Sequence, residues 1–156
     1  MNGENMIVKK IREGFVIDHI PAERGLTVLG LLEAEEKSRG PIILLMNVES
    51  KKMGKKDIVK LIDMSPKKQT VDKISLVAPN ATFNAIKDFN VVEKRKAERP
   101  NRVVGILRCP NPKCITNDEK EHVTSVLRLM DRESPLYVCQ YCDRMVEEEA
   151  IPDLLL

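Results

Sequence analysis

Four cysteines in two close pairs restrict the fold of this chain more than any other feature of its sequence. Cys109 and Cys114 enclose the stretch CPNPKC, and Cys139 and Cys142 enclose the stretch CQYC. Each pair can sit on a tight turn, a knuckle, so that all four sulfurs face one ion. This is the ligand pattern of a closed, tetrahedral zinc site. The stretches between and beside the knuckles, HVTSVLRLM and SPLYV, have the length of short strands. We therefore predict an all-β zinc ribbon that holds one structural zinc ion per chain.

Other uses of four thiols fit the sequence less well. Disulfides are disfavoured inside cells, and we expect an intracellular, cytoplasmic location. The N-terminal stretch MNGENMIVKKIREG lacks the apolar segment of a signal peptide, and no apolar run is long enough to span a membrane. A redox C-x-x-C pair would stand next to a strand–helix unit without a second pair. Because four protein thiolates leave no position for water, we expect the zinc to stabilise the fold and not to catalyse a reaction.

The balance of charge changes near residue 100. Up to Arg102 the chain carries 20 Lys and Arg against 14 Asp and Glu, and from Val103 onward it carries 6 against 10. We predict two domains, 1–98 and 103–156, joined by the polar stretch KRKAERPNR. The acidic second domain favours docking onto a protein over binding to nucleic acid, which requires an exposed basic face. An aromatic content of only 3% also argues against stacking of single-stranded bases.

Apolar periodicity in the first domain predicts an α+β fold. The expected strands cover 7–11, 15–20, 41–48, 57–63, 81–86 and 90–95, the first two of which are either two strands or one bent strand. The expected helices begin at Pro21 and at Ser65-Pro66. The uninterrupted apolar run 41–48 predicts a central strand, and the alternation in 57–63 predicts a strand with one wet face. This order favours a ferredoxin-like antiparallel sheet with two helices on one face.

Two basic clusters are candidates for an anion site in this domain. The stretch KKMGKKDIVK carries five lysines, Lys51, Lys52, Lys55, Lys56 and Lys60, and a second cluster, KRK, spans 94–96. The ends of an antiparallel sheet can bring these clusters together, although a solvated surface is the plainer interpretation. Neither G-x-x-x-x-G-K-[ST] nor G-x-G-x-x-G occurs, so any nucleotide site is not of the hydrolytic P-loop kind.

The dipeptide Asp18-His19 lies inside the apolar stretch FVIDHI. Either it is a satisfied interior polar pair, or it reaches a ligand. Adjacent residues of a strand point to opposite faces, so we do not expect the two side chains to form an acid–base dyad. No other catalytic motif occurs in the chain.

Taken in order, the stretches GFVIDHIPAERGL, SKKMGKKDIVK, APNATFNAIKDFNVVEK and CPNPKCI with CQYC resemble the regulatory chains of aspartate carbamoyltransferase. The resemblance runs from about Lys9 to Arg144. It implies a non-catalytic chain that dimerises through its N-terminal domain, three such dimers linking two catalytic trimers into a dodecamer. It also implies that CTP inhibits, that ATP activates and that UTP assists CTP at the N-terminal domain. The zinc domain would dock onto the catalytic chain, with no nucleic-acid or membrane partner.

The resemblance further implies roles for individual residues. Asp18 and His19 match polar contacts to the ribose and the phosphates, Lys60 a lysine near the ribose and base, Lys94 a phosphate-binding lysine, and Lys56 a further basic position. The positions that match the lining of the base and sugar are Val8, Ile11, Val16, Asn84, Ile86 and Val91. The zinc ligands match Cys109, Cys114, Cys139 and Cys142, and the interface with the catalytic chain matches Asn111 and Tyr141. Departures from the usual family residues are Lys9, Lys10 and Phe89.

Two other functions are compatible with parts of the sequence. A zinc-ribbon adaptor or nucleic-acid-binding module would use the basic first domain on a phosphate backbone, and its affinity would fall steeply with salt. An enzyme using Asp18 and His19 would turn over substrate as an isolated chain. A nucleotide-binding regulatory chain would instead discriminate among bases.

Overall fold

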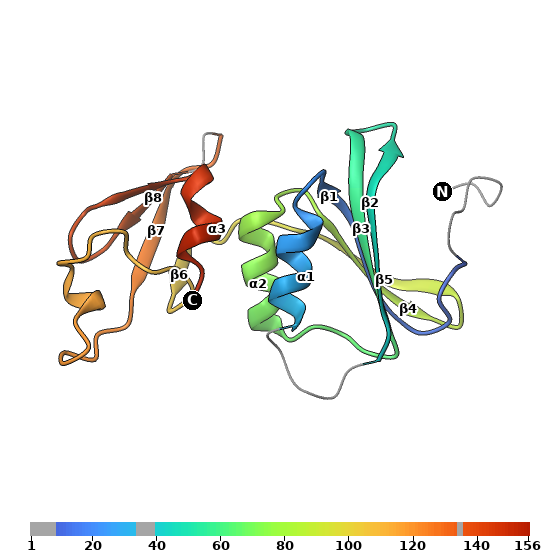
Figure 1. The fold of residues 1–156 in the computed structure, drawn as a ribbon, viewed down its shortest axis with the longest axis horizontal. Coiled ribbons are helices and arrows are strands. Elements are labelled where there is room, and N and C mark those ends of the chain that lie inside the picture. The colour runs from blue at the N-terminus through green and yellow to red at the C-terminus, as the bar shows by residue number, and fades with distance from the viewer. Residues whose placement is uncertain (1–8, 34–39, 134–135) are drawn as a thin grey trace.

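The protein folds into two antiparallel sheets, one in each half of the chain (Figure 1). The computed structural model describes residues 9–33, 40–133 and 136–156. The elements of the first half are β1 (Gly14–Pro21), α1 (Gly25–Glu33), β2 (Ile42–Ser50), β3 (Gly54–Ile62), α2 (Lys68–Val77), β4 (Thr82–Lys87) and β5 (Asn90–Lys96). Their strands follow the order β2-β3-β1-β4-β5, and both helices cover the same face. The predicted ferredoxin-like arrangement is confirmed, with β5 as an additional edge strand.

The second half is a small all-β unit with a short C-terminal helix. Its elements are β6 (Arg102–Val104), β7 (Val126–Asp131), β8 (Leu136–Cys139), β9 (Met145–Glu147) and α3 (Ile151–Leu154), with single 3₁₀ turns at Ile115–Asn117 and Glu148–Ala150. The strands pair in sequence order. The predicted ribbon is therefore confirmed. Among the described residues, no helix is long and apolar enough to cross a membrane.

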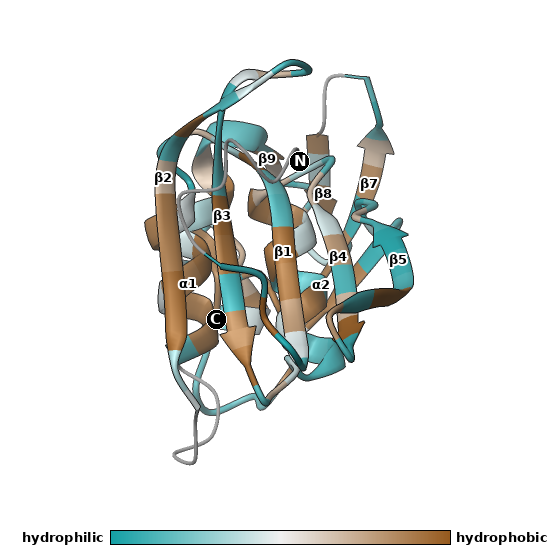
Figure 2. Cartoon of the chain, turned by 90° about the vertical axis from the view of Figure 1, so that its right-hand side faces the viewer, coloured by the Kyte–Doolittle hydropathy of each residue, from teal (hydrophilic) through white to brown (hydrophobic). Residues whose placement is uncertain are grey.

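Strand β2 does not occupy the central position that the sequence predicted for it. The apolar strand β2 lies at an edge of the sheet, whereas β3 pairs with β2 on one side and β1 on the other. Figure 2 views the face opposite the helices and shows apolar β2 at one edge and polar β5 at the other. The predicted wet face of β3 is also wrong, because Ile58 and Lys60 are only 2% and 6% exposed. A lysine can bury its aliphatic stem, so alternation with lysine overstated the exposure of β3.

Both helices begin later than predicted. Pro21 ends β1 instead of opening α1, and the Arg24 N–H donates to the Pro21 carbonyl across a turn (3.0 Å). The first helical N–H, that of Gly25, donates to the Asp57 carboxylate of β3 (2.8 Å). Helix α2 begins at Lys68 after an extended Lys67, not at Ser65-Pro66. Since the cap of α1 comes from a residue 32 positions away, local sequence could not locate that start.

The remaining strand predictions divide into one success and one error. The hairpin of β4 and β5 is confirmed. The expected strand at 7–11 is absent among residues 9–11, and the rest of that stretch lies outside the described residues. Figure 1 shows the described residues before β1, 9–13, on the open side of the sheet, away from the helices.

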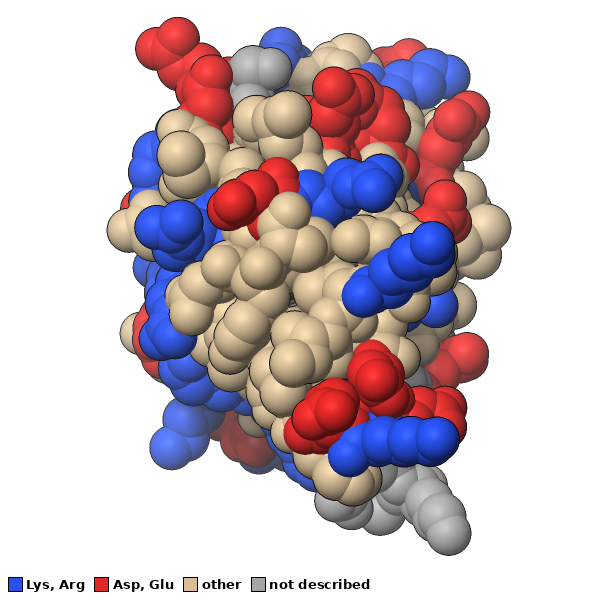
Figure 3. All heavy atoms as spheres, turned by 90° about the vertical axis from the view of Figure 1, so that its left-hand side faces the viewer, with Lys and Arg blue, Asp and Glu red and all other residues tan. Residues whose placement is uncertain are grey.

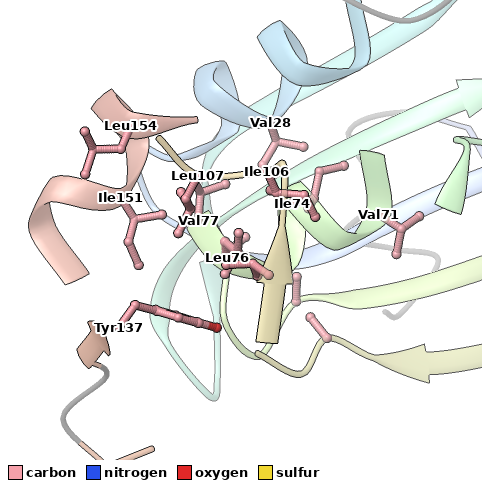
Figure 4. Close-up of a cluster of buried hydrophobic side chains, with 14 of the residues drawn as sticks. Val28, Val71, Ile74, Leu76, Val77, Ile106, Leu107, Tyr137, Ile151 and Leu154 are labelled. Atoms are coloured by element: carbon pink, nitrogen blue, oxygen red, sulfur yellow. The ribbon is translucent and has the colours of Figure 1, made fainter. Parts of the chain in front are cut away.

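The two halves share one continuous apolar core. Figure 4 shows Val77 of α2 beside Leu107, and shows Ile151 and Leu154 of α3 on the other side of Leu107. Leu107 and Ile151 are fully buried, and Leu154 is 7% exposed. Helix α3 is fastened to the same region because the Arg108 N–H donates to the Leu154 carbonyl (2.7 Å). The C-terminal tail therefore closes the ribbon and joins it to the first domain.

The connection between the domains is held by the ribbon. Arg99 forms an ion pair with Glu148 (2.5 Å), and the Tyr137 hydroxyl donates to the Pro100 carbonyl (2.6 Å). Burial raises the pKa of Tyr137 to about 12, so its hydroxyl keeps the proton that it donates. Arg99 and Pro100, in the polar stretch that we expected to be a linker, are thus bonded to the second domain.

Candidate functional site

The four predicted ligand sulfurs come together in one cluster. The Sγ atoms of Cys109, Cys114, Cys139 and Cys142 all lie within 4.8 Å of one another. The Cys109–Cys142 sulfurs are 3.4 Å apart, and the Cys114–Cys139 sulfurs are 3.8 Å apart. A metal with four sulfurs at roughly 2.3 Å separates those sulfurs by about 3.8 Å, so the cluster has the dimensions of a tetrahedral site. All four cysteines are free, and their sulfurs are too far apart for the disulfide length of about 2.05 Å.

Hydrogen bonds shape the first knuckle around the sulfurs. The Asn117 side-chain amide donates to the carbonyls of Cys109 (2.9 Å) and Asn111 (2.7 Å). The Cys114 N–H donates to the Asn111 carbonyl (3.0 Å), and the Thr116 hydroxyl contacts the Cys114 sulfur (3.2 Å). Sequence reasoning missed Thr116 and Asn117, although polar residues directly after a knuckle are the natural candidates for such support.

Without a metal, burial disfavours ionisation of two of the four thiols. Burial raises the pKa of the Cys109 and Cys139 thiols. Burial also opposes ionisation of Cys142, but hydrogen bonds, first that of the Arg144 N–H, lower its pKa to about 7. Buried thiols of this kind become thiolates when a metal replaces their protons, so metal binding releases protons and stabilises the fold.

A second candidate site lies on the face of the first sheet opposite the helices. It is a cavity of about 470 Å³, lined by His19, Lys52, Met53, Asn80, Thr82, Lys94 and Lys96. Three lysines and no carboxylate belong to this lining. The predicted convergence of the two basic clusters is thereby found, with Lys52 from the first and Lys94 and Lys96 from the second.

A bulge in β1 at Asp18 and His19 brings His19 into the lining of the cavity. His19 has a φ of 57°, and its backbone N–H donates to Asp18 Oδ1 (2.6 Å). The His19 ring contacts the Thr82 hydroxyl through Nδ1 (2.6 Å), whereas Asp18 Oδ1 pairs with Lys56 Nζ (2.9 Å). The expectation that the two residues point to opposite faces is wrong, because the bulge interrupts the strand alternation. The ring and the Asp18 carboxylate nevertheless have different partners.

The predicted binding residues form a row beside the cavity. Antiparallel register aligns four of them across β3, β1, β4 and β5, namely Lys60, Val16, Asn84 and Lys94. Of this row only Lys94 lines the cavity. The Asn84 amide donates to the Val16 carbonyl (3.2 Å) and so helps to hold the strands.

Lys60 is the most buried cation of this row. It is 6% exposed, and within the described residues it has neither a hydrogen bond nor an ion pair. Burial lowers the pKa of Lys60, and the nearby charge of Asp18 partly opposes that shift. The side chain of Lys60 is thus buried while its amine has no fixed acceptor, so the amine is available to an acceptor on a ligand.

The other predicted residues lie farther from the cavity. Ile86 pairs with Val91 toward the far end of the hairpin, where Phe89 and Val91 are more than half exposed. Ile11 is 7% exposed, and Val8 lies outside the described residues. Sequence reasoning did not assign Lys52, Met53, Asn80, Thr82 or Lys96 to the site, although the first and last belong to the clusters that it noted.

The outer end of the ribbon carries a largely uncharged surface. Figure 3 views the molecule from this end and shows an uncharged area with acidic and basic side chains around it. The large apolar side chains that the ribbon and its C-terminal tail expose are Val104, Ile115, Met130, Tyr141, Met145 and Leu156. Asn111 is half-buried in the first knuckle, and Tyr141 in the second knuckle is 47% exposed.

Comparison with known proteins gives one consistent result. A family model described as aspartate carbamoyltransferase regulatory chain, allosteric domain, matches residues 6–98, and the metal binding domain of the same chain matches residues 101–152. The aspartate carbamoyltransferase regulatory chain of Korarchaeum cryptofilum is 52% identical, over 97% of each chain. That of Hyperthermus butylicus is 47% identical, over 99% of this chain and 96% of its own. That of Pyrococcus abyssi is 51% identical, over 92% and 94%.

Proposed function

This chain belongs to the family of aspartate carbamoyltransferase regulatory chains, and from that premise we propose which ligands and partners its two domains bind. It is a non-catalytic subunit with an allosteric domain and a metal-binding domain. In our proposal residues 1–98 bind CTP, ATP and UTP, and residues 103–156 hold zinc and dock onto a catalytic chain. Effector binding then alters the catalytic chain through a coupling free energy, typically about 1–3 kcal/mol.

The cationic cavity is the observation that carries the nucleotide proposal. Its volume of about 470 Å³ lies within the range of roughly 300–1,000 Å³ usual for small-molecule sites. Lys52, Lys94 and Lys96 supply positive charge without a carboxylate in the lining, which suits a triphosphate. Lys60 and Asn84 lie in the adjacent row, where they can meet the sugar and the base. We assign two roles to Asp18 and Lys56: they hold His19 in place, and they help to position the phosphates.

We propose zinc as the ion at the four cysteines. Four thiolates in a tetrahedral arrangement select zinc or iron, and a closed site with no redox partner favours zinc. A cytoplasmic setting belongs to this proposal, because the thiols must remain reduced.

The partners follow from the exposed surfaces. The uncharged end of the ribbon is our candidate for the contact with the catalytic chain, and we assign Asn111 and Tyr141 in the two knuckles to the same contact. The edge strand β2 presents the apolar run 42–46, whereas the opposite edge, β5, ends in three cations. Like charges oppose pairing of two β5 edges, so we place the homodimer contact at β2. Three such dimers would join two catalytic trimers into a dodecamer.

Calorimetric titration with CTP, ATP and UTP tests the nucleotide site. We expect saturable binding of at least one nucleotide and a loss of about 10- to 100-fold in affinity for Lys94→Ala, because a charge-assisted phosphate contact is removed. Lys68→Ala is the matched control, since Lys68 is 87% exposed on α2 and its removal changes the net charge equally. Equal losses in the two variants would contradict the site. Tight binding of an oligonucleotide that weakens steeply with salt would favour a nucleic-acid-binding module instead.

Nucleotide affinity should also depend on the protonation of His19. Burial lowers the pKa of His19 below its usual value of 6.5; Asp18 raises it, and Lys56, Lys52 and Lys94 lower it. The free ring is therefore neutral at pH 7, and a bound polyanion raises its pKa, so the complex takes up a proton. Relative to His19→Ala, affinity of the parent should increase as pH falls from 8 to 6. The measurement is titration across this range, and identical pH profiles for the two proteins would refute the role of the ring.

A further inference from the structure

Strand β3 is flanked by two β-bulges at nearly the same level, one in β1 and one in β2. On one side Asp18 and His19 of β1 stand between the paired positions that flank Ile58. On the other side Met46 and Asn47 of β2 stand between the positions that flank Asp57. One residue of each bulge has a left-handed backbone, with φ of 57° at His19 and 59° at Asn47. A bulge bends its strand and increases the local twist, so two adjacent bulges define a bend of the sheet at this level.

The carboxylate of Asp57 is built into this bend. Asp57 is fully buried, and its two oxygens accept two backbone N–H groups, that of Asn47 (2.9 Å) and that of Gly25 at the start of α1 (2.8 Å). The Asn47 N–H belongs to the extra residue of the bulge, and the Gly25 N–H is one that the helix leaves unpaired. Asp57 thereby fixes the β2 bulge to the helix layer. Its side chain faces the helices, on the opposite side of the sheet from the cavity.

The bend determines where the tip of the β2–β3 hairpin lies. Figure 2 shows this hairpin extending beyond the other strands and curling over at its end. Lys52 and Met53 in the turn line the cavity together with His19 and Thr82, which come from strands on the other side of β3. A straight hairpin would carry the turn away from these partners.

We infer that Asp57 is a positioning residue: by holding the β2 bulge it places Lys52 at the cavity, where Lys52 binds the phosphates of the ligand. The inference rests on the proposed nucleotide function. It adds Lys52 to the phosphate-binding lysines and assigns a role to a carboxylate that does not touch the ligand.

The test is a double-mutant cycle on the full, metal-loaded chain with CTP, repeated with ATP if CTP does not bind. Lys52→Ala removes the contact, and Asp57→Asn replaces one acceptor oxygen by an N–H donor while keeping the shape. We expect each single variant to lose about tenfold in affinity, the effect of one charge-assisted contact. The double variant should lose little more than either one, because both changes remove the same contact.

Two controls separate positioning from general destabilisation. Lys55→Ala removes a lysine of the same hairpin that does not line the cavity, and should bind as the parent does. Ser75→Ala breaks a buried hydrogen bond to the Val71 carbonyl in α2 (2.9 Å), far from the bulge, and should also bind normally. Additive losses in the cycle, or parent-like affinity in Asp57→Asn, would overturn the inference.

A ligand-free measurement keeps the two proposals distinguishable. Met53 and Thr82 line the same cavity. Nuclear Overhauser effects that connect their methyl groups, directly or through the lining residues between them, should be present in the parent, weakened in Asp57→Asn and kept in Ser75→Ala. If the parent bound no nucleotide, the proposed function would fail, and the methyl contact would still decide whether Asp57 positions the hairpin. An unchanged contact in Asp57→Asn would show that it does not.

Discussion

Removal of the metal should unfold the ribbon and abolish association with the catalytic chain. The ribbon has four short strands around Tyr137, Leu127 and Val146, and a unit of this size buries too little apolar surface to fold alone. Structural zinc supplies apparent binding free energies of about 10–16 kcal/mol in small zinc domains. Cys114→Ala, or chelation of the metal from the parent, should therefore reduce the strand content that circular dichroism measures by the contribution of β6–β9. Sedimentation with catalytic trimers should show no complex.

The nucleotide site should survive this loss. Every residue that lines the cavity comes from the first domain, so calorimetric titration should still detect nucleotide binding to the Cys114→Ala chain. Lys113→Ala is the control, because Lys113 is an exposed neighbour of Cys114 that is not a ligand. Retained trimer binding by metal-free protein would contradict the proposed role of the ribbon. Loss of nucleotide binding would mean that the first domain depends on the second for its fold.

The metal site was predictable from sequence because its information is local. Each knuckle places two cysteines within a few residues, and tetrahedral sulfur geometry requires only that two knuckles meet. Most strands and both helices of the first domain were also accessible, since apolar periodicity reports them directly. The identity of the edge strand was not, because the apolar run 42–48 has the same pattern whether it is covered by its own sheet or presented to another chain. Strand β2 carries this run and lies at an edge of its sheet.

The geometry of the anion site depends on contacts that the sequence does not display. The pairing of Lys60 with Val16, and of Val16 with Asn84, follows from register, which a period-two pattern leaves open. The bulge that turns His19 toward Thr82 breaks the alternation on which strand predictions rest. Charge clustering still indicated which two segments meet, because lysines gather only where an anion or solvent stabilises them. The sequence thus indicated that positive charge would gather at this place, but it did not indicate the shape of the cavity.

The shared core predicts that truncation of one side chain in the C-terminal tail destabilises both domains. Ile151 in α3 is fully buried beside Leu107 and Val77, at the junction of the two halves. Ile151→Ala should lower the free energy of unfolding by about 2–5 kcal/mol, from lost transfer free energy and the cavity left behind. In a chain of this length each kcal/mol shifts Tm by roughly 2–4 °C, so a decrease of about 4–20 °C is expected. Calorimetric unfolding of the metal-loaded chain should show the unfolding of both halves shifted to lower temperature by the substitution, because the two halves bury the same cluster. Met145→Ala is the control: Met145 is 62% exposed on β9, and its truncation should change the stability by less than about 0.5 kcal/mol.

Two separate transitions, of which only one shifts in Ile151→Ala, would show that the domains unfold independently. The junction would then be too weak to carry a signal from the nucleotide cavity to the ribbon.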